Sequence, residues 1–262
     1  MAGGKRKRTM MKMAELFKQY LEHIFRGKRQ DARQLIVDAE DRGISASKLL
    51  KMIVWPAMEQ IDRLSREDQI PVLIEHMAAR INRMVADELH GMLARSPKDG
   101  RRMIVVCGEG ETSELGAQIV ADLFEADGWN VWFLGAGVPN DEILQFAAKI
   151  KCDLLCVYGT VASGVAGTRN LVDMIRRVGA CDQMQILVGG GVFNRADGLA
   201  DEIKADMFAG NINDIFRVVE EHPVRIPRPD MPEPGRRRKR KAHQPEPAVI
   251  TKMRKATITV EI

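Results

Sequence analysis

The sequence has 262 residues, a length that suits one large domain or two smaller ones. Hydrophobic residues make up 45% of it and the net charge is only +4, which favours a packed core and excludes a chain that is disordered throughout. No apolar run approaches the roughly 20 residues that span a bilayer, and the basic start MAGGKRKRTMMKM lacks the apolar stretch of a secretory signal, so we expect a cytoplasmic protein.

The charge is distributed unevenly along the chain. Residues 1–12 carry five positive charges and residues 225–262 carry a net charge of +7, so the segment between them carries −8. The densest basic run, GRRRKRK at 235–241, can neutralise phosphates, but such a run is also typical of a solvated tail that binds nothing specific. Nucleic-acid contact through the two basic ends is therefore a hypothesis.

Amphipathic periodicity predicts helices after a basic N-terminal arm at 1–12. Pro56 is expected to kink the third helix or to begin a new one, and Pro71 suits the first turn of the fourth. Short connections between such helices predict a compact four-helix bundle over residues 13–95. The helical segments are 14–27, 29–43, 45–68 and 70–94.

The pattern changes after a polar hinge, RSPKDGRR at 95–102. Short apolar runs that end in glycine then alternate with helical stretches across residues 101–222. This alternation predicts a flavodoxin-like α/β domain, with a five-stranded parallel sheet in the order 2-1-3-4-5 and helices on both faces. Ligands of such sheets bind outside the carboxyl ends of the strands, near the reversal between strands 1 and 3.

The four cysteines are predicted to be reduced thiols in the core, because they lie mostly in or beside apolar runs and form no CxxC pair. The spacing of Cys152 and Cys156 would place them on the same face of one strand. A metal or redox role is the alternative. The remaining cysteines are Cys107 and Cys181.

From residue 223 the chain becomes proline-rich and charged, which predicts a flexible or polyproline-like tail over 223–262. Its last residues, ATITVEI, alternate as a strand does, so they either pair with a sheet edge or stay disordered.

The turn after the first predicted strand, EGETSELG at 109–116, is the candidate ligand site. It contains no dinucleotide-binding G-x-G-x-x-G fingerprint, and its glutamates would repel a phosphate. No Ser/His/Asp or Cys/His arrangement predicts nucleophilic catalysis anywhere in the chain. We therefore expect a binding module rather than an enzyme.

The order of bundle, hinge and sheet over residues 15–221 resembles the cobalamin-binding modules of corrinoid methyltransferases and of light-sensing cobalamin repressors. The turn resembles that family's D/E-x-H-x-x-G signature. Glu111 matches the acidic position and Gly116 the glycine, but Ser113 stands where the family has histidine.

Three further stretches carry the resemblance. In the bundle, Glu75 and His76 match a Glu-His pair of the family's cap, but Ser65 stands where the family has tryptophan ten residues earlier. The third-strand Ser-x-Leu falls at or near 158–160. The glycines at 189–191 follow the family's fourth strand.

The resemblance implies a cobalt-binding site without its usual protein ligand. In the family the turn histidine supplies the lower axial nitrogen and the acidic residue orients its imidazole. A serine hydroxyl is a poor donor by comparison, so Ser113 is not expected to bind cobalt, and Glu111 is expected to have lost its partner. Three interpretations stay open: cobalamin bound with its own base on cobalt, another ligand, or a scaffold without a ligand.

These features predict a cobalamin-binding sensory or regulatory module that has a protein partner and no protein ligand to the metal. The alternatives are a degenerate scaffold that acts through protein or nucleic-acid partners, and a corrinoid carrier in methyl transfer. His76 is either a residue over the upper face of the corrin or a helix histidine satisfied by a neighbouring carboxylate. The predicted cofactor-binding residues are Glu75, His76, Glu111, Ser113, Gly116, Gly159, Thr160, Gly189, Gly190 and Gly191.

Overall fold

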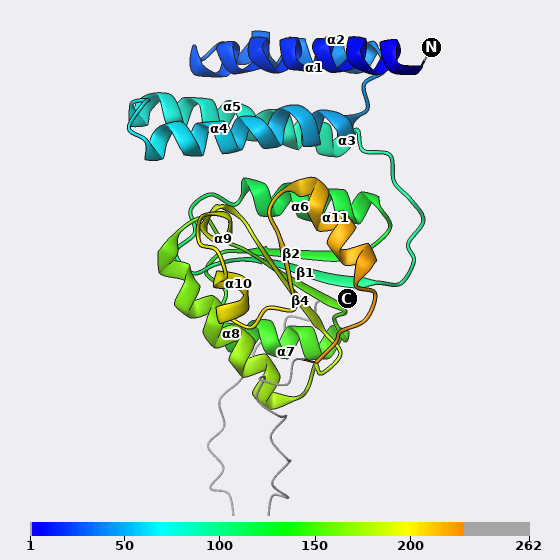
Figure 1. The fold of residues 1–262 in the computed structure, drawn as a ribbon, viewed down its shortest axis with the longest axis vertical. Coiled ribbons are helices and arrows are strands. Elements are labelled where there is room, and N and C mark those ends of the chain that lie inside the picture. Colours follow the sequence, from blue (N-terminus) through cyan, green and yellow to red (C-terminus); the bar gives the residue numbers. More distant parts are fainter. Residues whose placement is uncertain (1, 228–262) are drawn as a thin grey trace, which may run out of the picture.

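A five-stranded parallel sheet forms the centre of the computed structural model, which describes residues 2–227 (Figure 1). The strand order is β2-β1-β3-β4-β5 and every neighbouring pair is parallel, so the predicted fold class and topology are confirmed. The strands are near-continuously apolar because helices cover both faces of the sheet. They are β1 (Arg102–Cys107), β2 (Asn130–Gly135), β3 (Leu154–Tyr158), β4 (Gln185–Gly189) and β5 (Met207–Ala209).

The helices that follow the strands lie on opposite faces of the sheet. Helices α6 (Leu115–Ala126) and α11 (Ile212–Glu221) cover one face, and α7 (Asn140–Ile150) and α8 (Val165–Val178) cover the other (Figure 1). The helical stretch between β4 and β5 is divided into two short helices, because Gly198 between them has a φ of +79° and breaks the helical path. These are α9 (Gly191–Arg195) and α10 (Leu199–Glu202).

The predicted helical bundle forms two further layers above α6 and α11, and we call it the cap (Figure 1). Helices α4 and α5 lie next to the sheet domain, and α1 and α2 lie outside them. Residues 2–12 of the predicted basic arm have helical backbone and belong to α1, while the division of the chain into domains stays a prediction. The cap consists of α1 (Ala2–Phe25), α2 (Arg29–Asp41), α3 (Ala46–Leu49), α4 (Trp55–Arg66) and α5 (Val72–Gly91).

A π-helical turn, Leu50–Val54, joins α3 to α4 without a break in the helical path. Pro56 follows it in the first turn of α4. Proline has no N–H to donate and crowds the carbonyl four residues before it, and a widened turn ahead of it relieves both constraints. Pro56 therefore marks a new helical segment, one of the two outcomes expected from the sequence.

A buried amide ties three parts of the cap together. Asn82 of α5 is fully buried and donates from Nδ2 to the Val54 carbonyl oxygen at 3.0 Å. Tyr20 of α1, also fully buried, donates from its hydroxyl to Asn82 Oδ1 at 2.9 Å. Burial costs a polar group its water, so each of these groups depends on the other for its partner.

Replacing Asn82 with alanine is expected to lower the free energy of unfolding by about 2 kcal/mol, because the Tyr20 hydroxyl and the Val54 carbonyl would stay buried without a partner. Urea denaturation followed by circular dichroism measures this change. The matched control is Lys18→Ala on the exposed side of α1, for which we expect a change below about 0.5 kcal/mol. Equal effects of the two substitutions would contradict the role of the amide.

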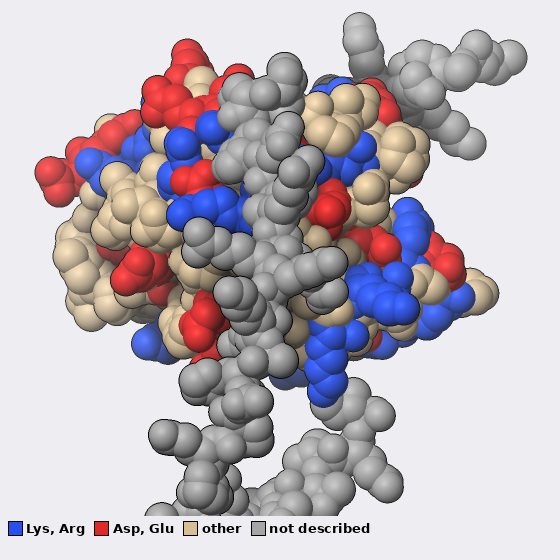
Figure 2. Space-filling view, turned by 90° about the horizontal axis from the view of Figure 1, so that it is seen from below, with Lys and Arg blue, Asp and Glu red and all other residues tan. Residues whose placement is uncertain are grey.

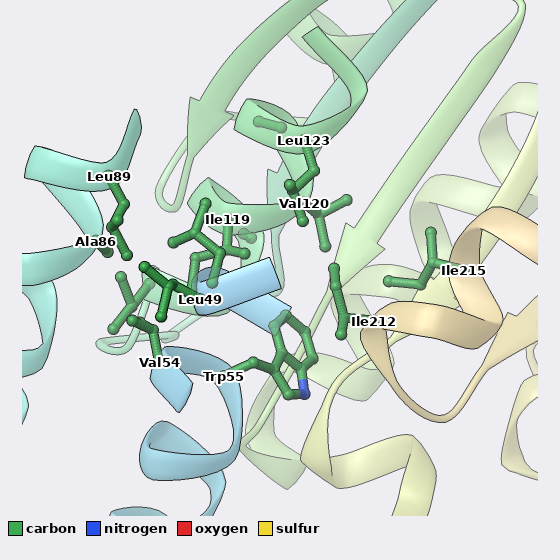
Figure 3. Packing of buried hydrophobic residues seen from close by; sticks show 14 of the residues in the cluster. Leu49, Val54, Trp55, Ala86, Leu89, Ile119, Val120, Leu123, Ile212 and Ile215 are labelled. Carbon is green, nitrogen blue, oxygen red and sulfur yellow. The ribbon is translucent and has the colours of Figure 1, made fainter. Parts of the chain in front are cut away.

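The cap shares one hydrophobic core with the α6 and α11 face of the sheet domain. Val54 and Trp55 of the cap point toward Ile119 of α6 and Ile212 of α11 (Figure 3). A separate cluster fills the other face, beneath α7 and α8. The cap is thus held against the sheet domain by continuous apolar packing, which fixes its position over the ends of the strands.

All four cysteines are free and buried, as expected of core thiols. The prediction that Cys152 and Cys156 share a face is wrong. Cys152 precedes β3 and packs in the α7 and α8 cluster, whereas Cys156 lies within β3 and packs under α6. Burial raises the pKa of each of these two thiols to about 12, so both stay protonated and poorly reactive near neutral pH.

The chain leaves the sheet domain at its edge near β5. Arg225 and Arg176 both pair with the buried carboxylate of Asp206, the former at 3.0 Å.

The predicted strand ATITVEI and the basic run at 235–241 lie outside the described residues, so nucleic-acid contact through them stays a prediction. No helix among residues 2–227 is long and apolar enough to cross a membrane. On the face opposite the cap, acidic and basic side chains are interspersed (Figure 2).

Candidate functional site

A cleft of about 680 Å³ lies between the cap and the carboxyl ends of the strands. Helices α4 and α5 form its upper wall. The turns after β1, β3 and β4 form its lower wall, at the strand-order reversal where ligands of such sheets bind. Ligand sites typically measure about 300–1,000 Å³, so the cleft is large enough for a cofactor. A second hollow of about 300 Å³ beside β5 is smaller and lies away from this reversal.

The predicted residues divide into two groups. Those that line the cleft are Glu75, His76, Ser113, Thr160, Gly190 and Gly191. Those that lie behind its walls are Glu111, Gly116, Gly159 and Gly189.

Glu111 connects the turn after β1 to the turn after β3. Its buried carboxylate accepts hydrogen bonds from the backbone N–H of Ser113 at 2.9 Å and of Thr160 at 2.6 Å, and from the Thr160 hydroxyl at 2.8 Å. Bonds to a carboxylate are stronger than bonds between neutral groups. The expectation that Glu111 lacks a partner without a histidine is therefore wrong, because the carboxylate has an internal structural role.

The glycines at the strand ends allow close contacts within the protein itself. Gly190 has a φ of +99°, and a Cβ atom there would lie 2.3 Å from the Gly159 carbonyl oxygen. A Cβ atom on Gly116 would lie 2.2 Å from the Tyr158 hydroxyl oxygen. Glycine is required at these positions whether or not a ligand approaches.

The Glu-His pair of the cap is not a hydrogen-bonded pair. Glu75 instead accepts a short hydrogen bond from the Ser65 hydroxyl, so the residue at the family's tryptophan position holds the carboxylate. His76 is exposed to the cleft, and no carboxylate or other hydrogen-bond partner contacts it within residues 2–227. The interpretation of His76 as a histidine satisfied by a neighbouring carboxylate is therefore wrong.

The cleft also contains charged residues that were not predicted from the sequence to belong to the site. Arg195 of α9 donates to the Thr160 carbonyl at 2.5 Å and lies 3.9 Å from Asp62 of α4, so it bridges the two walls. Glu59 accepts from Trp55 Nε1 at 2.8 Å, and burial raises its pKa. The helical spacing of 55, 59 and 62 on α4 is the signal that places these residues on one face.

Tyr158, the last residue of β3, forms part of the lower wall. It is only 4% exposed, and its ring lies against Gly116 of α6. The ring of Trp55 meets it edge-on, with the centroids 6.2 Å apart. Burial first, and then the negative charges of Glu111 and Glu59, raise the pKa of Tyr158 far above its ordinary value, so its hydroxyl stays protonated.

The residues that line the cleft include one histidine, His76 of the cap, and none from the sheet domain. Ser113 lines the cleft at the position where the family has its axial histidine. Across residues 2–227, no group of three or more His, Cys, Asp or Glu side chains is placed to hold a metal ion. The protein therefore offers a pocket of mixed polar and apolar character without an imidazole from the sheet side.

Both parts of the chain match family models of known cofactor-binding domains. Residues 101–220 match the model described as B12 binding domain, and residues 16–89 match a second model with the same description. The first covers the sheet domain and the second covers the cap.

Relatives and solved structures agree with this match. Dimethylamine corrinoid protein 1 of Methanosarcina acetivorans is 20% identical over 195 residues, which are 74% of this chain and 91% of that protein. Monomethylamine corrinoid protein 1 of the same organism is 25% identical over 192 residues, 71% of this chain and 87% of that protein.

The monomethylamine corrinoid protein of Methanosarcina barkeri has the same fold, with a TM-score of 0.67 at 22% identity over 76% of this chain and 93% of that one. Cap, sheet order and both domain matches thus agree, and the chain belongs to the B12-binding domain family, in the form that carries an N-terminal helical cap.

Proposed function

We propose that this protein binds a corrinoid in the cleft and presents it to a methyltransferase partner, as a carrier in methyl transfer. The observation that carries the proposal is the cleft itself, which lies between two segments that both match B12 binding domains. The relatives named as methylamine corrinoid proteins support a carrier more than the sensory or regulatory role that the missing histidine suggested. No contact within residues 2–227 specifically favours the sensory role.

The cleft residues fit a corrin ring. Met58 and Ala79 of the cap and Leu115 of α6 offer apolar surface to the faces of a flat macrocycle. Arg80, which is exposed and has no partner among the described residues, offers donors to the amide groups at its rim. When it is bound, the corrinoid supplies a cobalt centre that accepts and donates the methyl group.

The lower axial position is where this chain differs from the family's signature. Because Ser113 offers only a hydroxyl, we infer that a bound cobalamin keeps its own dimethylbenzimidazole base on cobalt. The hydrogen bonds that Glu111 accepts from Ser113 and Thr160 hold the turn after β1 in shape without an imidazole. The carrier therefore depends on the cofactor for the ligand that related proteins supply from the turn.

The test uses the full-length protein purified without cofactor and mixed with cobalamin at micromolar concentration. We expect the visible spectrum of cobalamin to co-elute with the protein in size-exclusion chromatography, at about one corrinoid per chain. The base-on form should persist in the bound fraction. A protein peak without corrinoid absorbance would refute the proposed function.

A further inference from the structure

Tyr158 blocks the space beneath the cleft. Its ring lies at the carboxyl end of β3, on the sheet face covered by α6. The contact with Gly116 leaves no room between ring and helix, since even a methyl group there would clash with the phenol. Trp55 of the cap supports the ring from the side, so the ring is fixed between cap, sheet and helix.

The turns after the strands are joined by backbone hydrogen bonds on either side of this ring. Gly108 donates to the Tyr158 carbonyl at 2.8 Å, which joins the turn after β1 to β3. Gly159 donates to the Gly189 carbonyl at 3.0 Å, and Val192 donates to the Gly159 carbonyl at 3.2 Å, which join the turn after β3 to β4. These hydrogen bonds hold the carboxyl ends of β1, β3 and β4 together below the cleft.

The hydroxyl of Tyr158 has no hydrogen-bond partner among the described residues, and it is not one of their fully buried side-chain atoms that lack a partner. The ring is therefore buried, while the hydroxyl oxygen keeps some exposed surface in a residue that lines the cleft. Tyrosine often combines a buried ring with a hydroxyl that reaches solvent or a ligand. Because this hydroxyl stays protonated, it can donate to water or to an acceptor on a molecule bound in the cleft.

We propose that Tyr158 is the floor of the cleft, that it keeps the nucleotide of a bound corrinoid outside the sheet domain, and that its hydroxyl donates to an acceptor on the corrinoid's lower side. This inference rests on the proposed function. A corrinoid carries its nucleotide on a flexible arm, which either stays beside the ring in the cleft or enters the space between sheet and α6. The ring of Tyr158 occupies that space, so this chain recognises the macrocycle and accepts corrinoids with or without a nucleotide.

The test compares cobalamin with cobinamide, which has the same macrocycle but no nucleotide. Isothermal titration of the full-length wild-type protein is expected to give dissociation constants that agree within about tenfold, since the nucleotide gains no contact in the space between the sheet and α6. Tyr158→Ser opens the space and is expected to raise the preference for cobalamin at least about tenfold. Tyr158→Phe keeps the floor and should leave the preference unchanged, while weakening both ligands about fivefold through the lost hydrogen bond.

A wild-type preference for cobalamin larger than about tenfold would overturn the inference and leave the carrier function standing. The same holds if Tyr158→Ser, folded by circular dichroism, shows the wild-type preference. Absence of binding by both corrinoids would refute the proposed function and the inference with it. The wild-type comparison decides the question even if Tyr158→Ser does not fold.

Discussion

Replacing Ala79 with tryptophan is expected to lower the affinity for cobalamin at least about 100-fold, because the larger side chain enters the cleft where the macrocycle binds. Ala79 lies on α5 and is only partly exposed, at a position that lines the cleft and belongs to neither hydrophobic core cluster. Isothermal titration with cobalamin measures the change. The temperature of thermal unfolding should stay close to that of the wild type.

The matched control is Ala14→Trp, which adds the same side chain to the exposed surface of α1, outside the cleft. Its affinity for cobalamin should equal that of the wild type. Tight binding by Ala79→Trp would move the corrinoid site away from the cleft. Weak binding by both variants would point to a general effect of an added tryptophan.

The sheet order was predictable from the sequence because each strand is a short apolar run that ends in glycine, and the helical stretches between the runs leave only parallel pairing. The helical bundle was predictable from the helical periodicity of its apolar residues. The π-helical turn at Leu50–Val54 had no such pattern, because its geometry depends on Pro56 and on the Asn82 amide that binds the Val54 carbonyl. The prediction that Cys152 and Cys156 share a face was wrong because β3 begins at Leu154, two residues after Cys152.

The candidate site was only partly predictable for a similar reason. The signature positions identified the turn after β1, and Ser113 does line the cleft. Besides the nearby Ser113 N–H, Glu111 binds Thr160, which is 49 residues away, and no local pattern reveals such a bond. The floor depends on Trp55, Gly116 and Tyr158 meeting from three different elements, which only the packing of the cap onto the sheet domain brings together.

Replacing Ser113 with histidine is expected to strengthen the binding of cobinamide at least about tenfold, because an imidazole at this position offers a nitrogen to a cobalt that has no base of its own. The same substitution should change the affinity for cobalamin little, since its own base already occupies the lower position and the floor at Tyr158 leaves the displaced nucleotide no buried site. Isothermal titration gives both affinities. Electron paramagnetic resonance of the reduced cobalt then reports whether a nitrogen is bound, through splitting of the cobalt lines.

Ser113→Ala is the control, because it removes the hydroxyl while the backbone N–H that Glu111 binds is kept. Neither corrinoid should bind differently to it. Nitrogen splitting with cobinamide in Ser113→His, and none in Ser113→Ala, would place the lower face of the macrocycle over the turn after β1. If Ser113→His binds cobinamide no better than the wild type and shows no splitting, the cobalt lies elsewhere. A double variant with Ser113→His and Tyr158→Ser tests both positions together. With the floor open, we expect cobalamin to exchange its own base for the imidazole, which the single substitution Ser113→His does not allow.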